Sequence, residues 1–153
     1  MLQQGYTLSV INKDHLAQCL HIEQTAEKSR SIRTEDELRN LLHCYTCYGL
    51  FNSNDELVCY AVFSIVLDEA ELIDINLLKT QQNKGLGTDF LKACLHELAK
   101  QQVIEIILEV AVDNPQAIKS YQKFKYTELG VRKNYYQNAD GTRSDALIYK
   151  IEL

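Results

Sequence analysis

The alternation of apolar and polar positions along the chain predicts helices and strands in a definite order. In some segments apolar residues recur every three to four positions, the spacing that places them on one face of a helix. Other segments are short and rich in β-branched and aromatic residues, which is typical of strands. The predicted helices span residues 13–27, 35–44, 85–100 and 115–124, and the predicted strands span 6–11, 48–51, 57–67, 72–78, 103–112, 126–133 and 144–152.

Several element boundaries carry signals of their own. Thr34 and Glu37 form a capping box before the second helix, and Asn114 followed by Pro115 begins the fourth. The segment 103–112 is almost continuously apolar, which predicts a strand covered on both faces. The three strands from 48 to 78 are joined by links too short for crossovers, so they form an antiparallel meander.

The resulting order is β-α-α-β-β-β-α-β-α-β-β. It predicts an α/β fold (α+β by some definitions), with a mixed, mainly antiparallel sheet flanked by helices. A chain of 153 residues fits one domain and buries a core of its own. No linker, low-complexity tract or internal repeat divides it, so we expect a single domain over residues 1–153.

Composition and charge argue against several functional classes of protein. The net charge of −5 argues against a general nucleic-acid binder, which needs a surplus of Lys and Arg. No stretch approaches the roughly 18 apolar residues of a membrane span, and the first residues lack the pattern of a signal peptide. We therefore expect no membrane partner. The five cysteines form no disulfide framework, which favours the cytoplasm as the compartment. A single C-x-x-C, Cys44 to Cys47, indicates structural thiols and no metal.

The loop from Gln82 to Thr88 contains two of the six glycines of the chain, Gly85 and Gly87. Glycine allows close approach of the backbone to a ligand, and the first N–H groups of a helix have no partner inside the helix. Together with the helix dipole and Lys84, they make an anion site suited to phosphate. The alternative is a helix that merely begins with glycines. The dinucleotide motif G-x-G-x-x-G and the P-loop motif are both absent from the sequence.

This loop resembles the pyrophosphate motif [RQ]-x-x-G-x-[GA] of the GNAT acetyltransferases, which also follows a strand and begins a helix. The segment 108–124 is similar to the next conserved block of that family, and 72–77 to its pantetheine-binding strand. The resemblance implies the GNAT fold and acetyl-CoA as co-substrate. The cofactor-binding residues that it implies are Ile75, Asn76, Leu77, Gln82, Asn83, Lys84, Gly85, Leu86, Gly87, Thr88 and Asn114.

Two segments, Val66 to Ala70 and Arg132 to Tyr136, resemble the bacterial RimI type, which acetylates the N-terminal alanine of a ribosomal protein. This resemblance implies an acceptor that is the α-amino group of a protein or peptide, such as a ribosomal protein. The chain departs from the type at Ser29 to Arg33, where a Pro-Trp pair is usual. A small amine or a lysine side chain is therefore an alternative acceptor, and a non-catalytic acyl-CoA-binding module is a third interpretation.

Acetyl transfer to an amine needs a base for the amine and an acid for the departing thiolate. Glu109 interrupts the apolar segment 103–112, where burial of a charge is costly; a solvated strand end is the alternative. Tyr121 lies about two turns into the fourth helix, where an ordinary core aromatic is the alternative. The resemblance implies Glu109 as the base and Tyr121 as the acid. It also implies that Tyr135 and Tyr136 bind the acceptor, with hairpin packing as the alternative.

Overall fold

The computed structural model describes residues 2–26 and 32–153 of the protein. The strands are β1 (Thr7–Ile11), β2 (Thr46–Phe51), β3 (Leu57–Val66), β4 (Glu69–Leu77), β5 (Glu105–Ala111), β6 (Tyr126–Gln137) and β7 (Arg143–Glu152), and the helices are α1 (Leu16–Thr25), α2 (Glu35–Cys44), α3 (Leu86–Lys100) and α4 (Pro115–Tyr121). Two short 3₁₀ helices, η1 (Lys13–His15) and η2 (Lys79–Gln81), precede α1 and α3. The order of strands and α-helices predicted from the sequence is confirmed.

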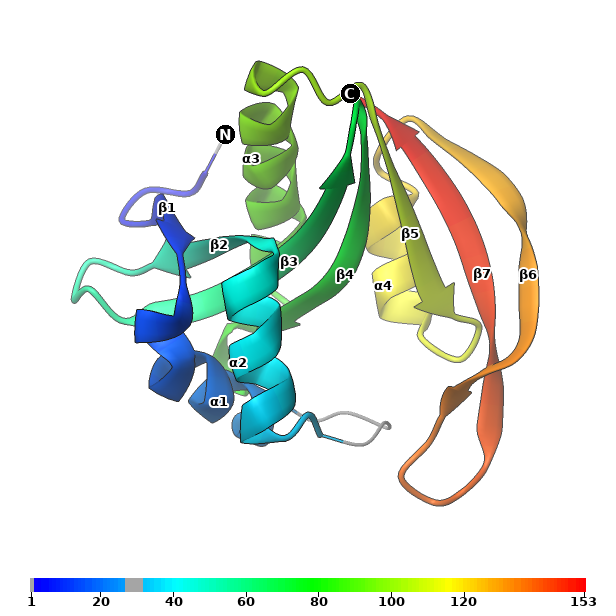
Figure 1. Ribbon diagram of the computed structural model, residues 1–153, viewed down its shortest axis with the longest axis horizontal. Coiled ribbons are helices and arrows are strands. Elements are labelled where there is room, and N and C mark those ends of the chain that lie inside the picture. Colours follow the sequence, from blue (N-terminus) through cyan, green and yellow to red (C-terminus); the bar gives the residue numbers. More distant parts are fainter. Residues whose placement is uncertain (1, 27–31) are drawn as a thin grey trace.

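The described residues form one seven-stranded sheet in the order β1-β2-β3-β4-β5-β7-β6. Figure 1 shows this sheet with helices on both of its faces. The pair β4–β5 is parallel, and the other neighbouring strands are antiparallel. Among the described helices, none is both long and apolar enough to cross a membrane.

Two apolar clusters hold the helices on opposite faces of the sheet. On one face, α3 and α4 pack buried side chains such as Phe90 and Tyr121 against Phe63 and Leu108. On the other face, α1 and α2 pack against the N-terminal strands, with residues such as Ile22 and Leu38 against Tyr60 and Val62. The helical spacing of these apolar residues is what predicted the helices, and the sheet is the surface that each apolar face covers.

The strand β5 differs from its prediction. Residues 103–112 were expected to be covered on both faces, but β5 spans residues 105–111 and is buried on alternate positions. Ile106, Leu108 and Val110 join the cluster under α3 and α4, whereas Glu109 is only partly buried. The reason is that α1 and α2 cover the N-terminal strands on the opposite face and leave that face of β5 open.

A β-bulge in β4 separates β4 from β5. Val62 of β3 pairs with Asp74 and the next residue, Phe63, pairs with Leu72, so Ile73 is an extra residue in β4. The pairing of β4 with β5 ends at the same point, at Leu72 and Leu108. Both strands continue, and Figure 1 shows them diverging from their common end. The bulge therefore opens the middle of the sheet.

We predict that Gly49→Ala in β2 lowers the free energy of unfolding by about 1–3 kcal/mol, as over-packing of a core does. An added Cβ at Gly49 would lie 2.6 Å from Cδ1 of Leu57 and 2.7 Å from Cγ2 of Ile11, both buried side chains. Gly130→Ala is the matched control, because its Cβ would meet no described atom within 4 Å. Urea denaturation measures both variants, and equal stability of the two would contradict the packing described for β2.

Candidate active site

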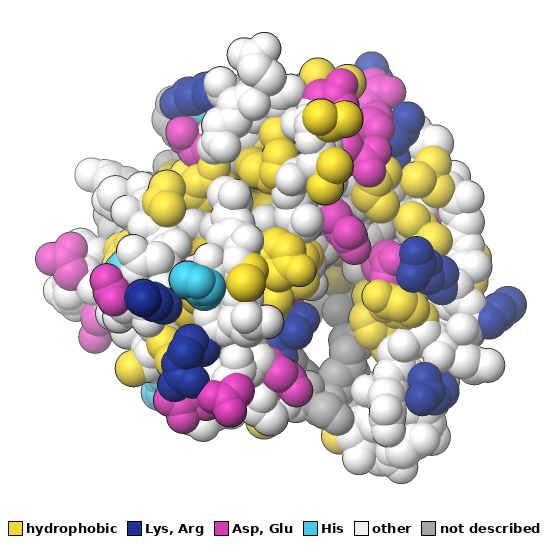
Figure 2. Space-filling model, in the orientation of Figure 1, with side chains coloured by type: hydrophobic (Ala, Val, Ile, Leu, Met, Phe, Trp, Pro, Cys, Tyr) yellow, Lys and Arg dark blue, Asp and Glu magenta, His cyan; other side chains and the backbone are white. Residues whose placement is uncertain are grey.

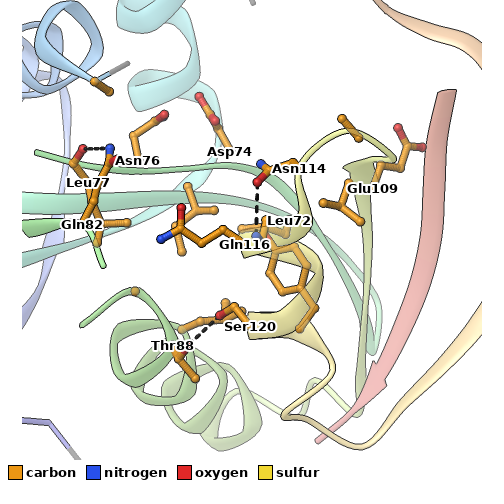
Figure 3. A pocket seen from close by; sticks show the side chains of 18 of the residues that line it. Leu72, Asp74, Asn76, Leu77, Gln82, Thr88, Glu109, Asn114, Gln116 and Ser120 are labelled. Carbon is orange, nitrogen blue, oxygen red and sulfur yellow. Dashed lines mark hydrogen bonds between the residues drawn. The ribbon is translucent and has the colours of Figure 1, made fainter. Parts of the chain in front are cut away.

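A cavity of about 890 Å³ occupies the opening between β4 and β5. Its walls come from β4, the loop before α3, the end of β5, and α4, as Figure 3 shows. The predicted site residues that line it are Ile75, Asn76, Leu77, Gln82, Asn83, Gly85, Leu86, Gly87, Thr88, Glu109, Asn114, Tyr121 and Tyr136. Lys84 and Tyr135 lie outside this lining. The topology thus gathers into one cavity most of the residues selected from the sequence.

The loop before α3 has the geometry of an anion cradle. Gly85 is the N-cap residue with φ of 76°, a left-handed conformation that glycine adopts without strain, and Asn83 has φ of 63°. No side chain in the described part of the chain caps this helix, so its first N–H groups remain available to a ligand. A Cβ at Gly87 would lie 3.3 Å from Cδ1 of Leu77. The residues present therefore fit a phosphate group at this helix start.

Polar contacts fix α4 against the cradle. The hydroxyl groups of Thr88 and Ser120 are hydrogen-bonded to each other across α3 and α4, as Figure 3 shows. The Gln116 side chain donates a hydrogen bond to the side chain of Asn83. The Asn114 side chain accepts the Ala117 N–H at 3.2 Å and caps α4. Gln116 and Ser120 were not selected from the sequence, although their spacing of four residues places them on one face of the helix.

The divergent part of β4 offers backbone groups to the cavity. Residues 75–77 pair with β3 along one edge of β4. Along the other edge, which faces β5, the pairing of β4 with β5 has already ended at Leu72. Ile75 and Leu77 pack on the face of α3 and α4. The side chain of Gln82 reaches back and donates to the carbonyl of Leu77 at 3.4 Å. An extended ligand arm can pair with such a strand edge as an added strand does.

A buried polar network supports the wall of the cavity on the side of α1 and α2. Glu23 of α1 is fully buried and accepts hydrogen bonds from the Arg33 backbone N–H at 3.0 Å and from the Tyr60 hydroxyl at 2.8 Å. The Asn76 side chain donates to the same Tyr60 hydroxyl at 3.0 Å. The Arg33 guanidinium pairs with Asp74 at 2.9 Å. These contacts connect α1 and the segment before α2 to the divergent part of β4.

The network was missed from the sequence. The one available signal is that Glu23 follows Ile22 and lies four residues after Cys19, so it borders the apolar face of α1. A carboxylate at such a position is buried only when hydrogen-bond partners surround it. Those partners come from β3 and from the segment before α2, which the pattern of one helix does not reveal.

Glu109 lies on the face of β5 away from the phosphate cradle. In Figure 3 its carboxylate lies across the cavity from the pair Thr88–Ser120. The side chain is 13% exposed and pairs with Arg132 at 3.3 Å between Oε1 and Nε. Burial raises the pKa of Tyr135, and a hydrogen bond with the Glu109 carboxylate raises it further. Glu109 is therefore accessible from the cavity and held by two residues of β6.

Tyr121 is buried at the end of α4, 7% exposed, and lines the cavity. Burial raises the pKa of its hydroxyl above the usual range, and the neighbouring Tyr136 and Asp74 raise it further. The hydroxyl is therefore protonated at neutral pH, as a proton donor must be.

The open face of the sheet is predominantly acidic near the cavity. Figure 2 looks onto this face and shows acidic side chains gathered over the paired ends of β4 and β5. There Glu69 lies directly across from Glu105, and a hydrogen bond between the two carboxyl groups raises the pKa of Glu69. A cationic group approaching the carboxylates over the paired ends of β4 and β5 meets a favourable potential.

All five cysteines are free thiols; Cys44 is exposed, whereas Cys47 is buried in β2, which begins at Thr46, two residues before its predicted start at residue 48. Burial raises the pKa of the Cys47 thiol to about 12, which makes it unreactive at neutral pH. Within residues 2–26 and 32–153, no three His, Cys, Asp or Glu side chains are grouped to hold a metal ion.

Comparison with known proteins agrees with this geometry. The model of the Acetyltransferase (GNAT) family matches residues 13–126. Because that match spans most of the chain, the chain belongs to the GNAT family of acetyltransferases. Acetyl-CoA is the co-substrate of GNAT acetyltransferases.

The relatives identify a type within the family. The ribosomal protein bS18-alanine N-acetyltransferase of Escherichia coli (strain K12) is 31% identical over 153 residues, which cover 96% of this chain and 97% of the relative. The enzyme of the same name from Salmonella typhimurium is 34% identical over 101 residues, or 66% of this chain and 68% of the relative. The crystal structure of the E. coli ribosomal-protein-S18-alanine N-acetyltransferase matches with a TM-score of 0.87 and 32% identity, over 96% of this chain and 93% of that one. The predicted GNAT fold and RimI-type resemblance are confirmed.

We predict that Glu23→Ala lowers the free energy of unfolding by about 3 kcal/mol, since it leaves the buried Tyr60 hydroxyl and the partly buried Arg33 N–H without their acceptor. Glu97→Ala is the control, because it removes a carboxylate from an exposed pair with Lys100 and changes stability by less than about 1 kcal/mol. Urea unfolding compares the two variants. Similar losses in both would show that the buried network contributes no more than a surface pair.

Proposed function

We propose that this chain transfers acetyl directly from acetyl-CoA to the α-amino group of a protein or peptide N-terminus, within a ternary complex. The observation that carries the proposal is that one cavity joins a phosphate cradle on one face of the sheet to a carboxylate, Glu109, on the other. An anionic cofactor and a cationic acceptor then enter from opposite faces. They meet where β4 and β5 diverge.

In this proposal the cofactor is bound largely by backbone groups. The N–H groups at the start of α3, from Gly85 to Thr88, hold the pyrophosphate, and Lys84 adds a positive charge outside the cavity lining. The backbone of residues 75–77 pairs with the pantetheine arm, and Asn114 lies beside that arm. The thioester would then lie near Tyr121, which lines the same cavity.

The proposed reaction uses one base and one acid. Glu109 takes a proton from the α-ammonium group of the acceptor, and the neutral amine attacks the thioester carbonyl carbon. The C–N bond forms, the C–S bond breaks, and Tyr121 gives its proton to the departing thiolate; the attached nitrogen loses its second proton, which restores the Tyr121 hydroxyl through solvent. Support for this assignment comes from the partial exposure of Glu109 in the cavity and from the raised pKa of Tyr121, which keeps it protonated.

The acceptor is proposed from the carboxylates on the open face of the sheet and from the relatives. An α-ammonium group carries the charge that the carboxylates on this face attract, and Tyr135 and Tyr136 of β6 lie beside it to bind the first residues of a peptide. The names of the E. coli and Salmonella relatives state an alanine of ribosomal protein bS18, and we propose that the acceptor of this chain is the N-terminus of a protein of this class. We place the enzyme in the cytoplasm on its cysteine pattern.

A small amine or lysine side chain stays the alternative acceptor, because the segment 29–33 departs from the RimI type. Of that segment, residues 29–31 lie outside the described residues, while Ile32 and Arg33 line the cavity.

Free-thiol release from acetyl-CoA separates these acceptors. The panel contains short peptides that begin with alanine or serine, the same peptides with blocked N-termini, and small polyamines. We expect turnover with free N-termini and none with the blocked copies. Turnover confined to small amines or to blocked peptides that contain lysine would overturn the proposed acceptor.

We predict that Glu109→Gln and Tyr121→Phe each lower kcat by about 10²–10⁴-fold, the usual contribution of a general base or acid. Because the pKa of Tyr121 is raised by burial, its hydroxyl stays protonated, and the loss in Tyr121→Phe is uniform between about pH 6 and pH 9.

Glu128→Gln and Tyr126→Phe, exposed residues of β6, are the matched controls and keep wild-type kcat. Steady-state kinetics at saturating acetyl-CoA measures all four variants. Near-normal kcat in both cavity variants would contradict the assigned roles.

A further inference from the structure

Tyr135 and Tyr136 are neighbours in sequence, yet both face the site. In a regular strand, successive side chains point to opposite faces of the sheet. Here the two rings touch edge to face, with centroids 5.0 Å apart and planes at 80°. Tyr135 contacts Glu109, and Tyr136 lines the cavity with Tyr121. Some departure from strand geometry must bring both rings to one side.

That departure is a bulge of β6. Arg132 pairs with Ala146 and Tyr136 pairs with Ser144, so four steps along β6 match two steps along β7. The extra residues lie between Arg132 and Tyr136, and they turn Tyr135 toward the site. Asn134 in the bulge has φ of 53°. This left-handed region costs most non-glycine residues about 1–2 kcal/mol, and Asn is among the few that adopt it more readily, so contacts from the neighbouring strand help to hold the bulge.

Asp145 provides two such contacts from β7, and the Arg143 guanidinium donates a third to the Asn134 carbonyl at 3.3 Å. Asp145 lies between the two residues of β7 that pair on either side of the bulge, directly across from it. One carboxylate oxygen accepts the Asn134 N–H at 2.8 Å, and the other accepts from Nζ of Lys133 at 3.3 Å. The bond with the Asn134 N–H also lowers the pKa of Asp145, so the carboxylate is ionised at neutral pH. A hydrogen bond to an ionised acceptor is stronger than one between neutral groups.

We propose that Asp145 is a positioning residue for the acceptor, which acts by holding the β6 bulge that places Tyr135 beside Glu109 and Tyr136 beside Tyr121. Asp145 itself lies outside the cavity lining, so it acts through the two tyrosines. This proposal rests on the proposed function for the identity of the acceptor. In this proposal, the intact bulge is needed to bind the acceptor peptide and is not needed to bind acetyl-CoA.

The test compares Asp145→Ala with the conservative Asp145→Asn. In Asp145→Ala the Asn134 N–H loses the carboxylate to which it donates. We expect the KM of the peptide that accepts acetyl to rise about tenfold, and the KM of acetyl-CoA to stay within about twofold of the wild-type value. Asp145→Asn keeps an oxygen for that N–H and is expected to restore most of the acceptor affinity. Lys133→Met removes only the ion pair and serves as the control, with an unchanged acceptor KM.

A second substitution tests whether the acceptor affinity lost in Asp145→Ala can be restored. Asn134→Gly in the Asp145→Ala background is expected to lower the acceptor KM toward the wild-type value, since glycine adopts the left-handed conformation without strain. A merely structural role of Asp145 would change thermal stability and both KM values together. Equal changes in both KM values, or an unchanged acceptor KM in Asp145→Ala, overturn the proposal.

A measurement without turnover separates this proposal from the proposed function. In the wild-type protein, a nuclear Overhauser contact between the Tyr135 and Tyr136 rings is expected, and in Asp145→Ala its loss is expected. Retention of that contact in Asp145→Ala overturns the positioning role even if no peptide is acetylated. If the contact is lost while the wild type acetylates only small amines, the positioning role stands and the proposed acceptor fails.

Discussion

The end of pairing between β4 and β5 is the constraint on which the site depends. Two parallel strands that stay in register use their facing N–H and C=O groups on each other. The extra residue Ile73 bends β4 away after Leu72, so the groups beyond it face an opening and not a neighbouring strand. The cavity, the exposed backbone of residues 75–77 and the access to Glu109 all follow from this one irregularity.

The opening also separates two electrostatic environments. The helix start at Gly85 presents backbone N–H groups on the face covered by α3 and α4, whereas acidic side chains gather on the other face over the paired ends of β4 and β5. Each wall is held by polar contacts between elements distant in sequence, such as Gln116 with Asn83 on one side and Glu23 with Tyr60 on the other. Such contacts keep the two walls of the cavity in fixed relation, which the proposed transfer between two bound substrates requires.

The sequence predicted what depends on local pattern and missed what depends on strand pairing. The order of elements follows from periodicity and is found in the fold as expected. The loop from Gln82 to Thr88 begins α3 as glycine placement and the family motif predict, and its binding of phosphate stays a prediction. The bulge at Ile73 left no signal, because a bulge is defined by the register of a partner strand. The two-sided burial expected for residues 103–112 is wrong because helix coverage is a tertiary property. Glu23 was passed over for the same reason, since its hydrogen-bond partners lie 10 and 37 residues away along the chain.

Hydrogen exchange in the presence and absence of acetyl-CoA, followed by mass spectrometry of peptides, tests the central claim most directly. If the cofactor lies along the divergent part of β4 with its phosphates at the start of α3, exchange slows in residues 73–77 and 83–88. The paired strands β1 and β2, on the far side of the sheet, keep the same exchange rates. Unchanged exchange in both cavity segments at saturating acetyl-CoA would contradict the account.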